Sequence, residues 1–146
     1  MKIFCGILLL LSVGVCTIFI KTYSTEYFSP LEFDIRVING FTNNSSLPLV
    51  IWCSSNDHDA DFGGRALQEG DDFSWKHKTE IFTWGATHHV SCTMKWDGKR
   101  RKFDAFKAPR DIHRCRLFRK CSWLVREDGF YFSNDEVNWK KDFSWL

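Results

Sequence analysis

Three aspartates stand at alternate positions in one short acidic segment, at Asp57, Asp59 and Asp61. Calcium prefers oxygen ligands, and carboxylates at alternate positions of a loop can supply them. The EF-hand pattern counted from Asp57, however, needs Gly at the sixth position and Glu at the twelfth, where this chain has Phe62 and Gln68. We therefore predict no metal site. We interpret the segment as a solvated turn whose Asp side chains bond their own backbone, followed by two glycines that permit positive φ.

The histidines and the common catalytic motifs offer no better site. His88 and His89 are adjacent, and adjacent residues of a strand point to opposite faces, so they make a poor chelate. The sequence contains no Ser-His-Asp order, nucleophile elbow or phosphate-binding loop. A hydrolase with paired carboxylates is the remaining enzymatic alternative, but nothing marks one pair as special. We predict no catalytic residue, no cofactor and a protein that is not an enzyme.

A basic segment, residues 99–102, gives the clearest indication of a partner. It lies in the stretch 95–120, which holds eleven Lys or Arg and three Asp. Clustered cations attract anionic surfaces over a long range. The alternative is a solvated hairpin tip balanced by the stretch 25–74, which has nine acidic and two basic residues. The predicted partner-binding residues are Lys99, Arg100, Arg101, Lys102, Asp57, Asp59 and Asp61.

Short runs with β character recur along the chain with turn signals between them, as is typical of a sandwich or barrel. The clearest run is 89–96, because Val90, Cys92 and Met94 fall on one face with Trp96. The run 47–53 is almost continuously apolar, as expected of a strand covered on both faces. No stretch of a dozen residues shows helical periodicity. The other expected strands are residues 34–39, 73–77, 80–84, 102–106, 121–126 and 130–133.

Two Asp-Gly pairs predict hairpins. Asp97-Gly98 lies between the runs 89–96 and 102–106, and Asp128-Gly129 lies just before the run 130–133. Seven Trp and fourteen Phe residues can fill a core between two sheets, because each buries a large apolar area. We predict an all-β fold, a small antiparallel β-sandwich of two sheets.

The N-terminus has the pattern of a secretion signal. Lys2 precedes an apolar run at residues 3–20, and the next charge is Lys21. Because a membrane span takes about 20 apolar residues, a signal anchor is the alternative. We predict a signal peptide at residues 1–24 and a secreted, extracellular protein with a single domain at residues 25–146.

Four cysteines remain once the predicted signal is removed. An even set in a secreted domain predicts two disulfides, with free buried thiols as the alternative. Four cysteines allow three pairings, and the sequence does not choose among them. The four residues are Cys53, Cys92, Cys115 and Cys121.

Two overlapping Asn-x-Ser sequons begin at Asn43 and Asn44. Such sequons belong on surface loops of secreted proteins. Because the two overlap, we expect one glycan and not two.

A series of short motifs runs through the chain in a fixed order. They are Val37-Ile38-Asn39, then Cys53-Ser54-Ser55 with Asp59, Asp61 and Gly63, then Phe73 and Trp75, then Cys92 and Trp96, and finally Cys121, Trp123, Asp128, Gly129 and Tyr131. In order and spacing, behind a signal peptide, these motifs resemble the plant self-incompatibility protein family, the S-protein homologues. His77 departs from the pattern, because the family tends to place phenylalanine there.

The resemblance implies two packed antiparallel sheets joined by disulfides, in a secreted protein ligand. Founding members of that family act on a pollen receptor and trigger calcium signalling. We expect a monomer that binds a cell-surface receptor or another extracellular partner, with acidic polysaccharide as a further candidate and no nucleic acid. The alternative function is a secreted defence protein that binds anionic walls or membranes through the basic segment.

Overall fold

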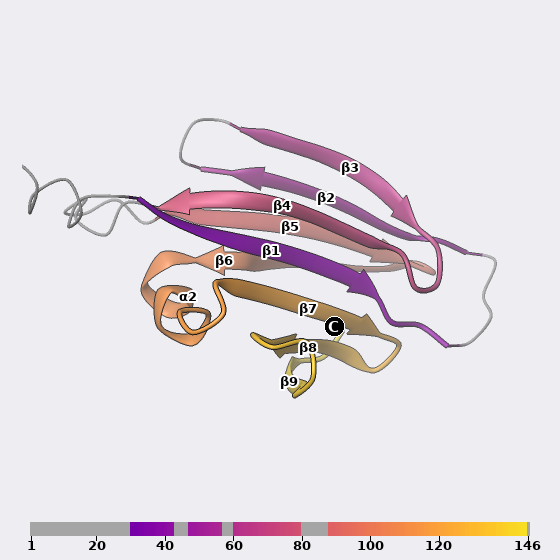
Figure 1. The fold of residues 1–146 in the computed structure, drawn as a ribbon. Helices are drawn as coiled ribbons and strands as arrows, with labels where there is room; N and C mark the ends of the chain where they lie inside the picture. Colours follow the sequence, from indigo (N-terminus) through magenta and orange to yellow (C-terminus); the bar gives the residue numbers. More distant parts are fainter. Residues whose placement is uncertain (1–29, 43–46, 57–59, 80–87, 146) are drawn as a thin grey trace, which may run out of the picture. The chain divides into compact units, whose positions relative to one another are not determined.

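The computed structural model describes residues 30–42, 47–56, 60–79 and 88–145, nearly all of them in one compact unit, Glu32–Thr79 with Thr83–Leu146. The other unit, Met1–Leu31 with Glu80–Phe82, lies almost wholly outside the described residues, as do the predicted signal peptide and the predicted strand 80–84. The described residues form these elements (Figure 1): β1 (Leu31–Asn39), β2 (Leu49–Ser55), β3 (Asp61–Leu67), β4 (Asp72–Thr79), β5 (His89–Trp96), β6 (Lys99–Lys107), α2 (Ala108–Arg114), β7 (Lys120–Arg126), β8 (Gly129–Ser133) and β9 (Lys140–Phe143).

The strands form two sheets, which confirms the predicted all-β sandwich. One sheet has the order β4-β1-β7-β8-β9 and the other the order β3-β2-β5-β6. The pairs β2–β3, β2–β5, β5–β6, β7–β8 and β8–β9 are antiparallel. β1 and β7 instead run parallel, from the pair Asp34–Lys120 to the pair Asn39–Val125. A parallel pair needs a long crossover, and here the chain forms β2 to β6 between the two strands.

Both predicted hairpins are present. Asp97 and Gly98 join β5 to β6 with φ values of 43° and 74°. Two positive φ values are what a tight two-residue hairpin turn requires. In the second hairpin Arg126 pairs with Gly129, so the turn lies one residue earlier than the Asp-Gly pair suggested. Gly129 is needed for a different reason: a Cβ there would lie 2.4 Å from the carbonyl oxygen of Phe143 in β9.

Aromatic side chains fill the space between the two sheets. The Phe103 ring of β6 lies 5.2 Å from Trp123 of β7 and 5.1 Å from Phe130 of β8. Trp123 is fully buried, and its indole N–H donates to the Ala105 carbonyl at 2.8 Å. Burial of each such side chain contributes roughly 1.5–3 kcal/mol. The predicted aromatic core is therefore what holds the sheets together.

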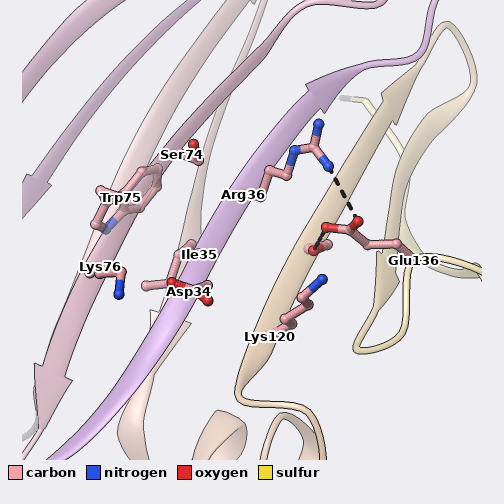
Figure 2. Close-up of a pocket in the computed structure, with 9 residues that line it drawn as sticks. Asp34, Ile35, Arg36, Ser74, Trp75, Lys76, Lys120 and Glu136 are labelled. Atoms are coloured by element: carbon pink, nitrogen blue, oxygen red, sulfur yellow. Dashed lines mark hydrogen bonds and ion pairs between the residues drawn. The ribbon is translucent and has the colours of Figure 1, made fainter.

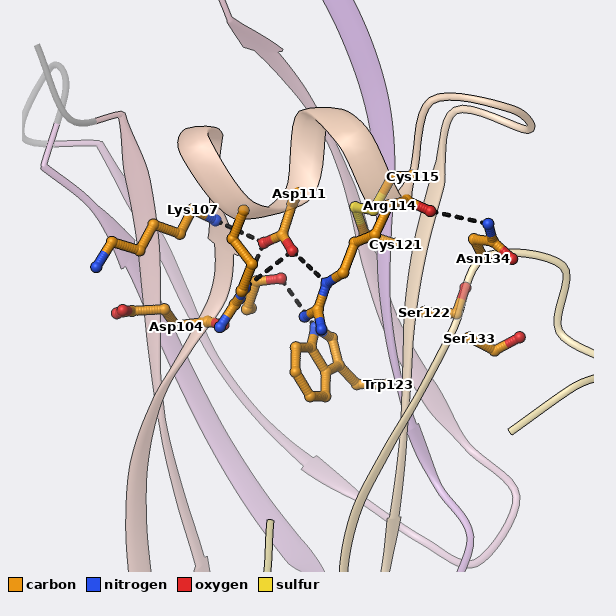
Figure 3. Close-up of a disulfide and its surroundings, with 12 residues drawn as sticks. Asp104, Lys107, Asp111, Arg114, Cys115, Cys121, Ser122, Trp123, Ser133 and Asn134 are labelled. Atoms are coloured by element: carbon orange, nitrogen blue, oxygen red, sulfur yellow. Dashed lines mark hydrogen bonds and ion pairs between the residues drawn. A yellow bond between two sulfur atoms is a disulfide. The ribbon is translucent and has the colours of Figure 1, made fainter. Parts of the chain in front are cut away.

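A short helix, α2, and a disulfide connect the two sheets between β6 and β7. Cys115 follows α2 and bonds Cys121 of β7, beside the fully buried carboxylate of Asp111 (Figure 3). That carboxylate accepts the Lys107 backbone N–H at 2.7 Å and ion-pairs with Arg110 and Arg114. The helix has seven residues, too few to show periodicity in the sequence and far short of a membrane span.

The second disulfide joins neighbouring strands of one sheet. Cys53 of β2 and Cys92 of β5 face each other in register and are fully buried. Both predicted disulfides are thus present in the structure. Neither disulfide bridges the two sheets across the core. Cys53–Cys92 lies within one sheet, and Cys115–Cys121 joins the end of α2 to β7.

The strands differ from the prediction in several places. The sequence did not predict β3 or β9, and β6 begins at Lys99 and not at residue 102. The strand predicted at 47–53 spans Leu49–Ser55, and it is not covered on both faces. Its Leu49, Ile51 and Cys53 are buried, but Val50 and Trp52 are 43% and 55% exposed.

Candidate functional site

The outward surface of the sheet β3-β2-β5-β6 combines apolar and cationic side chains. Each pair of neighbouring strands in an antiparallel sheet sends residues opposite each other to the same face. Val50 is paired with Lys95, and Lys95 with Arg100; Trp52 is paired with Thr93, and Thr93 with Lys102. We call these six residues the outer sheet face: Val50, Trp52, Thr93, Lys95, Arg100 and Lys102.

Trp52 is held in place by its neighbour on β3. A Cβ built on Gly64 would lie 2.4 Å from Cε3 of Trp52 and 3.1 Å from its Cζ3. The six-membered ring therefore lies against the Gly64 backbone, in space that a side chain would occupy. With more than half of its surface exposed, Trp52 presents an aromatic surface that is packed against the sheet.

The cations of this face form no ion pair with a described carboxylate. Lys95, Arg100 and Lys102 are exposed. In the described part of the chain, no carboxylate forms an ion pair with any of them. Asp104 lies two residues beyond Lys102 on the same face and accepts a hydrogen bond from Ser91, so the three cations outnumber the one carboxylate and leave a net positive charge.

The structure divides the predicted basic segment into two pairs. Arg100 and Lys102 belong to the outer sheet face. Lys99 instead lies over the Trp96 ring, with Nζ 5.2 Å from its centroid. The guanidinium of Arg101, whose strand partner is the buried Met94, lies 5.1 Å from the centroid of the Phe143 ring. The four residues are consecutive but do not form one cluster, because alternate residues of a strand face opposite ways.

The acidic segment is only partly described. Asp61 is the first residue of β3 and accepts the Gly63 N–H at 2.8 Å, as the interpretation of a self-bonded turn predicted. Gly63 has a φ of 80°, but both glycines lie inside β3 and not in a loop. The predicted sites at Asp57, Asp59, Asn43 and Asn44 lie outside the described residues. Among the residues that are described, no three His, Cys, Asp or Glu side chains are grouped to hold a metal ion.

A hollow of about 360 Å³ lies on the sheet β4-β1-β7-β8-β9 (Figure 2). Its central cation, Arg36, ion-pairs with Asp72 at 3.0 Å and with Glu136 at 3.2 Å. The hydrogen bond from Arg36 lowers the pKa of Asp72 below its ordinary value, against the opposing effect of burial. The same pair raises the pKa of Arg36. This hollow balances its central charge internally, which makes it a weaker candidate than the outer sheet face.

The Asp72 carboxylate predicts a pH dependence of stability. Its pKa is lower in the folded protein than in the unfolded chain, so the pair with Arg36 stabilises the fold above about pH 4, and this contribution is lost as the pH falls toward 2. Asp72→Asn should therefore lower the free energy of unfolding by about 1 kcal/mol or less at pH 7, and this difference from the wild type should shrink at pH 2.5. Urea unfolding at both pH values measures it. A difference that stays constant would contradict the assignment.

Sequence reasoning missed Val50, Trp52 and Lys95 as site residues. The apolar run around Trp52 predicts a strand covered on both faces, yet a sheet of a two-layer sandwich has one face in solvent. Once an antiparallel sandwich is predicted, alternation along residues 49–55 already requires that either the odd or the even residues face outward. Cys53, expected in a disulfide, would have placed the odd residues inside.

These features define a class: an all-β sandwich with two internal disulfides and an exposed face that is apolar and cationic. The chain matches the model of the family described as Plant self-incompatibility protein S1 over residues 34–145. It therefore belongs to the plant self-incompatibility protein S1 family, as the resemblance of its motifs predicted.

Named relatives support the same family. Over 117 residues the chain is 33% identical to S-protein homolog 2 of Arabidopsis thaliana, covering 78% of this chain and 68% of the relative. S-protein homolog 27 is 30% identical over 141 residues, which cover 92% and 87%. S-protein homolog 24 is 30% identical over 105 residues, which cover 71% of this chain and 65% of the relative. No solved structure matches the chain.

Proposed function

We propose that the protein is a secreted ligand that binds a partner at a cell surface and triggers signalling in the receiving cell, and that it is not an enzyme. Its family membership supports this proposal. In the same proposal, residues 1–24 are removed as a signal peptide, residues 25–146 act outside the cell as a monomer, and one glycan occupies Asn43 or Asn44.

The observation that carries the proposal is the outer sheet face. Its cations have no ion-pair partner among the described residues, and they lie beside exposed apolar groups. Charged groups steer a partner and set its orientation, whereas a desolvated aromatic anchor supplies affinity. A rigid sheet that presents both is suited to recognition.

The test is cytosolic calcium in plant cells, including pollen tubes, after addition of protein secreted and purified from plant cells. A rapid, saturable rise in at least one cell type is expected. Arg100→Gln/Lys102→Gln should weaken the response about tenfold or more, because both charges belong to the outer sheet face.

Arg101→Gln/Lys140→Gln is the matched control, because it removes two charges that lie outside the outer sheet face, one over the Phe143 ring and one on β9. It should respond like the wild type. No response in any cell type would overturn the signalling function. Salt-sensitive binding to anionic vesicles without a calcium response would instead favour the defence function.

A further inference from the structure

The outer sheet face is hollowed along its length. One hollow, of about 330 Å³, is lined by Trp52 and Thr93. A second, of about 620 Å³, extends to the hairpin turn, where Asp97 and Lys99 also line it. Both are lined by Val50, Lys95 and Arg100. Because they share these residues, they form one shallow trough across β2, β5 and β6, from Trp52 to the turn.

One side of the trough is apolar. Trp52 and Val50 follow each other on the same face of β2, and Leu47, 50% exposed, lines the far hollow. The face of an aromatic ring carries partial negative charge and attracts the weakly positive C–H groups of a flat ligand. Trp52 lies against Gly64, so its orientation is set before a ligand arrives.

The other side of the trough is mainly cationic, with Asp97 as the one carboxylate that lines it, at the hairpin turn. Lys95 and Arg100 are directly opposite each other on β5 and β6, an arrangement of like charges that is unfavourable in a sheet. Lys102 adds a third cation on the same face, two residues along β6. An anionic ligand between these side chains would relieve their repulsion and accept charge-assisted hydrogen bonds.

We propose that this trough binds one chain of an acidic polysaccharide, a polyuronate of the plant cell wall type. Such a chain carries a carboxylate on each sugar ring and apolar C–H groups on the ring face, which match the two sides of the trough. The trough is concave and Trp52 is held against the sheet, so the surface suits an extended chain better than a lipid bilayer, which apolar side chains must enter. The choice of a wall polymer rests on secretion, which is part of the proposed function.

Binding of polygalacturonate oligosaccharides to the full secreted protein, measured by calorimetry, tests this inference. Trp52→Ala and Lys95→Gln/Arg100→Gln should each weaken binding about tenfold or more. Arg101→Gln/Lys140→Gln, which removes two charges outside the trough, should bind within about twofold of the wild type. The fully methyl-esterified chain keeps the sugar rings but lacks the charge, and it should bind far more weakly.

Several results would overturn the inference. Trp52→Ala is directly comparable with the wild type, because the exposed side chain can be removed without opening the core, and circular dichroism checks the fold of the variant. Unchanged binding by this variant would exclude a role for the aromatic floor. Equal affinity for dextran sulfate and polygalacturonate would show general ion exchange and not a sugar site.

The two proposals can fail separately. A calcium response with no binding of polygalacturonate would overturn the polysaccharide site and leave the signalling function intact. Polygalacturonate binding that depends on Trp52, without a calcium response in any cell, would overturn the signalling function alone.

Discussion

Replacing Asp111 by alanine is expected to lower the free energy of unfolding by about 3 kcal/mol. Breaking a buried ion pair by removing one partner costs about 3–5 kcal/mol, because the remaining charge loses its compensation. Asp111 is fully buried, whereas the side chains of Arg110 and Arg114 are 36% and 25% exposed. Water can partly solvate these two guanidinium groups, which places the cost at the lower end of the range.

The consequences of this substitution extend to the connection between the sheets. Arg114 would retain Asp142, at 3.3 Å, but Arg110 would have no ion-pair partner among the described residues. The Lys107 N–H would also lose its acceptor at the start of α2. Both guanidinium groups lie within 6 Å of the centroid of the Trp123 ring. Unfolding in urea, followed by circular dichroism, measures the change in the free energy of unfolding.

Two controls separate charge from shape. Asp111→Asn keeps the size of the side chain and removes the charge. If it lowers the free energy of unfolding by nearly as much as Asp111→Ala, the effect is due to the ion pairs. Asp142→Asn breaks the exposed contact to Arg114 and should cost less than about 1 kcal/mol. If Asp111→Ala cost no more than Asp142→Asn, the buried carboxylate would not stabilise the connection.

The parts of the fold that were predictable from sequence are those fixed by local chemistry. Alternation in residues 89–96 placed Val90, Cys92 and Met94 on the buried face, and Asp97-Gly98 supplied the two positive φ values of the turn. These signals involve neighbours in the chain. The parallel pairing of β1 with β7 depends on residues 80 or more positions apart, and no local pattern indicates it.

The elements that were missed lack the pattern of a half-buried strand. β3 begins Asp-Phe-Gly-Gly, and glycine is poor in strands; its Gly64 is covered by the Trp52 ring of the paired strand. β9, Lys140–Phe143, lies at a sheet edge and has three exposed charged residues, so it shows no apolar alternation. In both cases the strand forms because it pairs with its neighbour, and its own sequence does not show the pattern of a strand.

The candidate site was half predictable for the same reason. Consecutive cations at residues 99–102 indicated a binding surface, but only the strand register shows that Arg100 and Lys102 lie beside Lys95 and Thr93 while Lys99 and Arg101 do not. The contribution of Trp52 depends on Gly64, its partner across β2 and β3. The sequence shows the cluster of cations, but only the pairing of the strands shows that some of them lie on the same face as Trp52.

Removing the Cys53–Cys92 disulfide is expected to destabilise the protein more than removing Cys115–Cys121. A disulfide restricts the unfolded chain, and the effect grows with the loop that it closes. The sequence separations are 39 and 6 residues, for which this model gives about 4 and about 2 kcal/mol. All four cysteines are fully buried, so the loss of packing on substitution with alanine is similar and largely cancels in the comparison.

Urea unfolding of Cys53→Ala/Cys92→Ala and Cys115→Ala/Cys121→Ala measures this difference, with the free energies compared at one temperature and pH. The reverse order would contradict the loop argument. It would mean that the short loop stabilises the native state directly, by holding the end of α2 so that Arg114 stays on Asp111 and over the Phe132 ring, 3.6 Å from its centroid. Combining Asp111→Ala with the loss of Cys115–Cys121 then decides between the two explanations, because a contribution through the unfolded chain adds to the cost of Asp111→Ala, whereas a contribution through the Arg114 contacts does not.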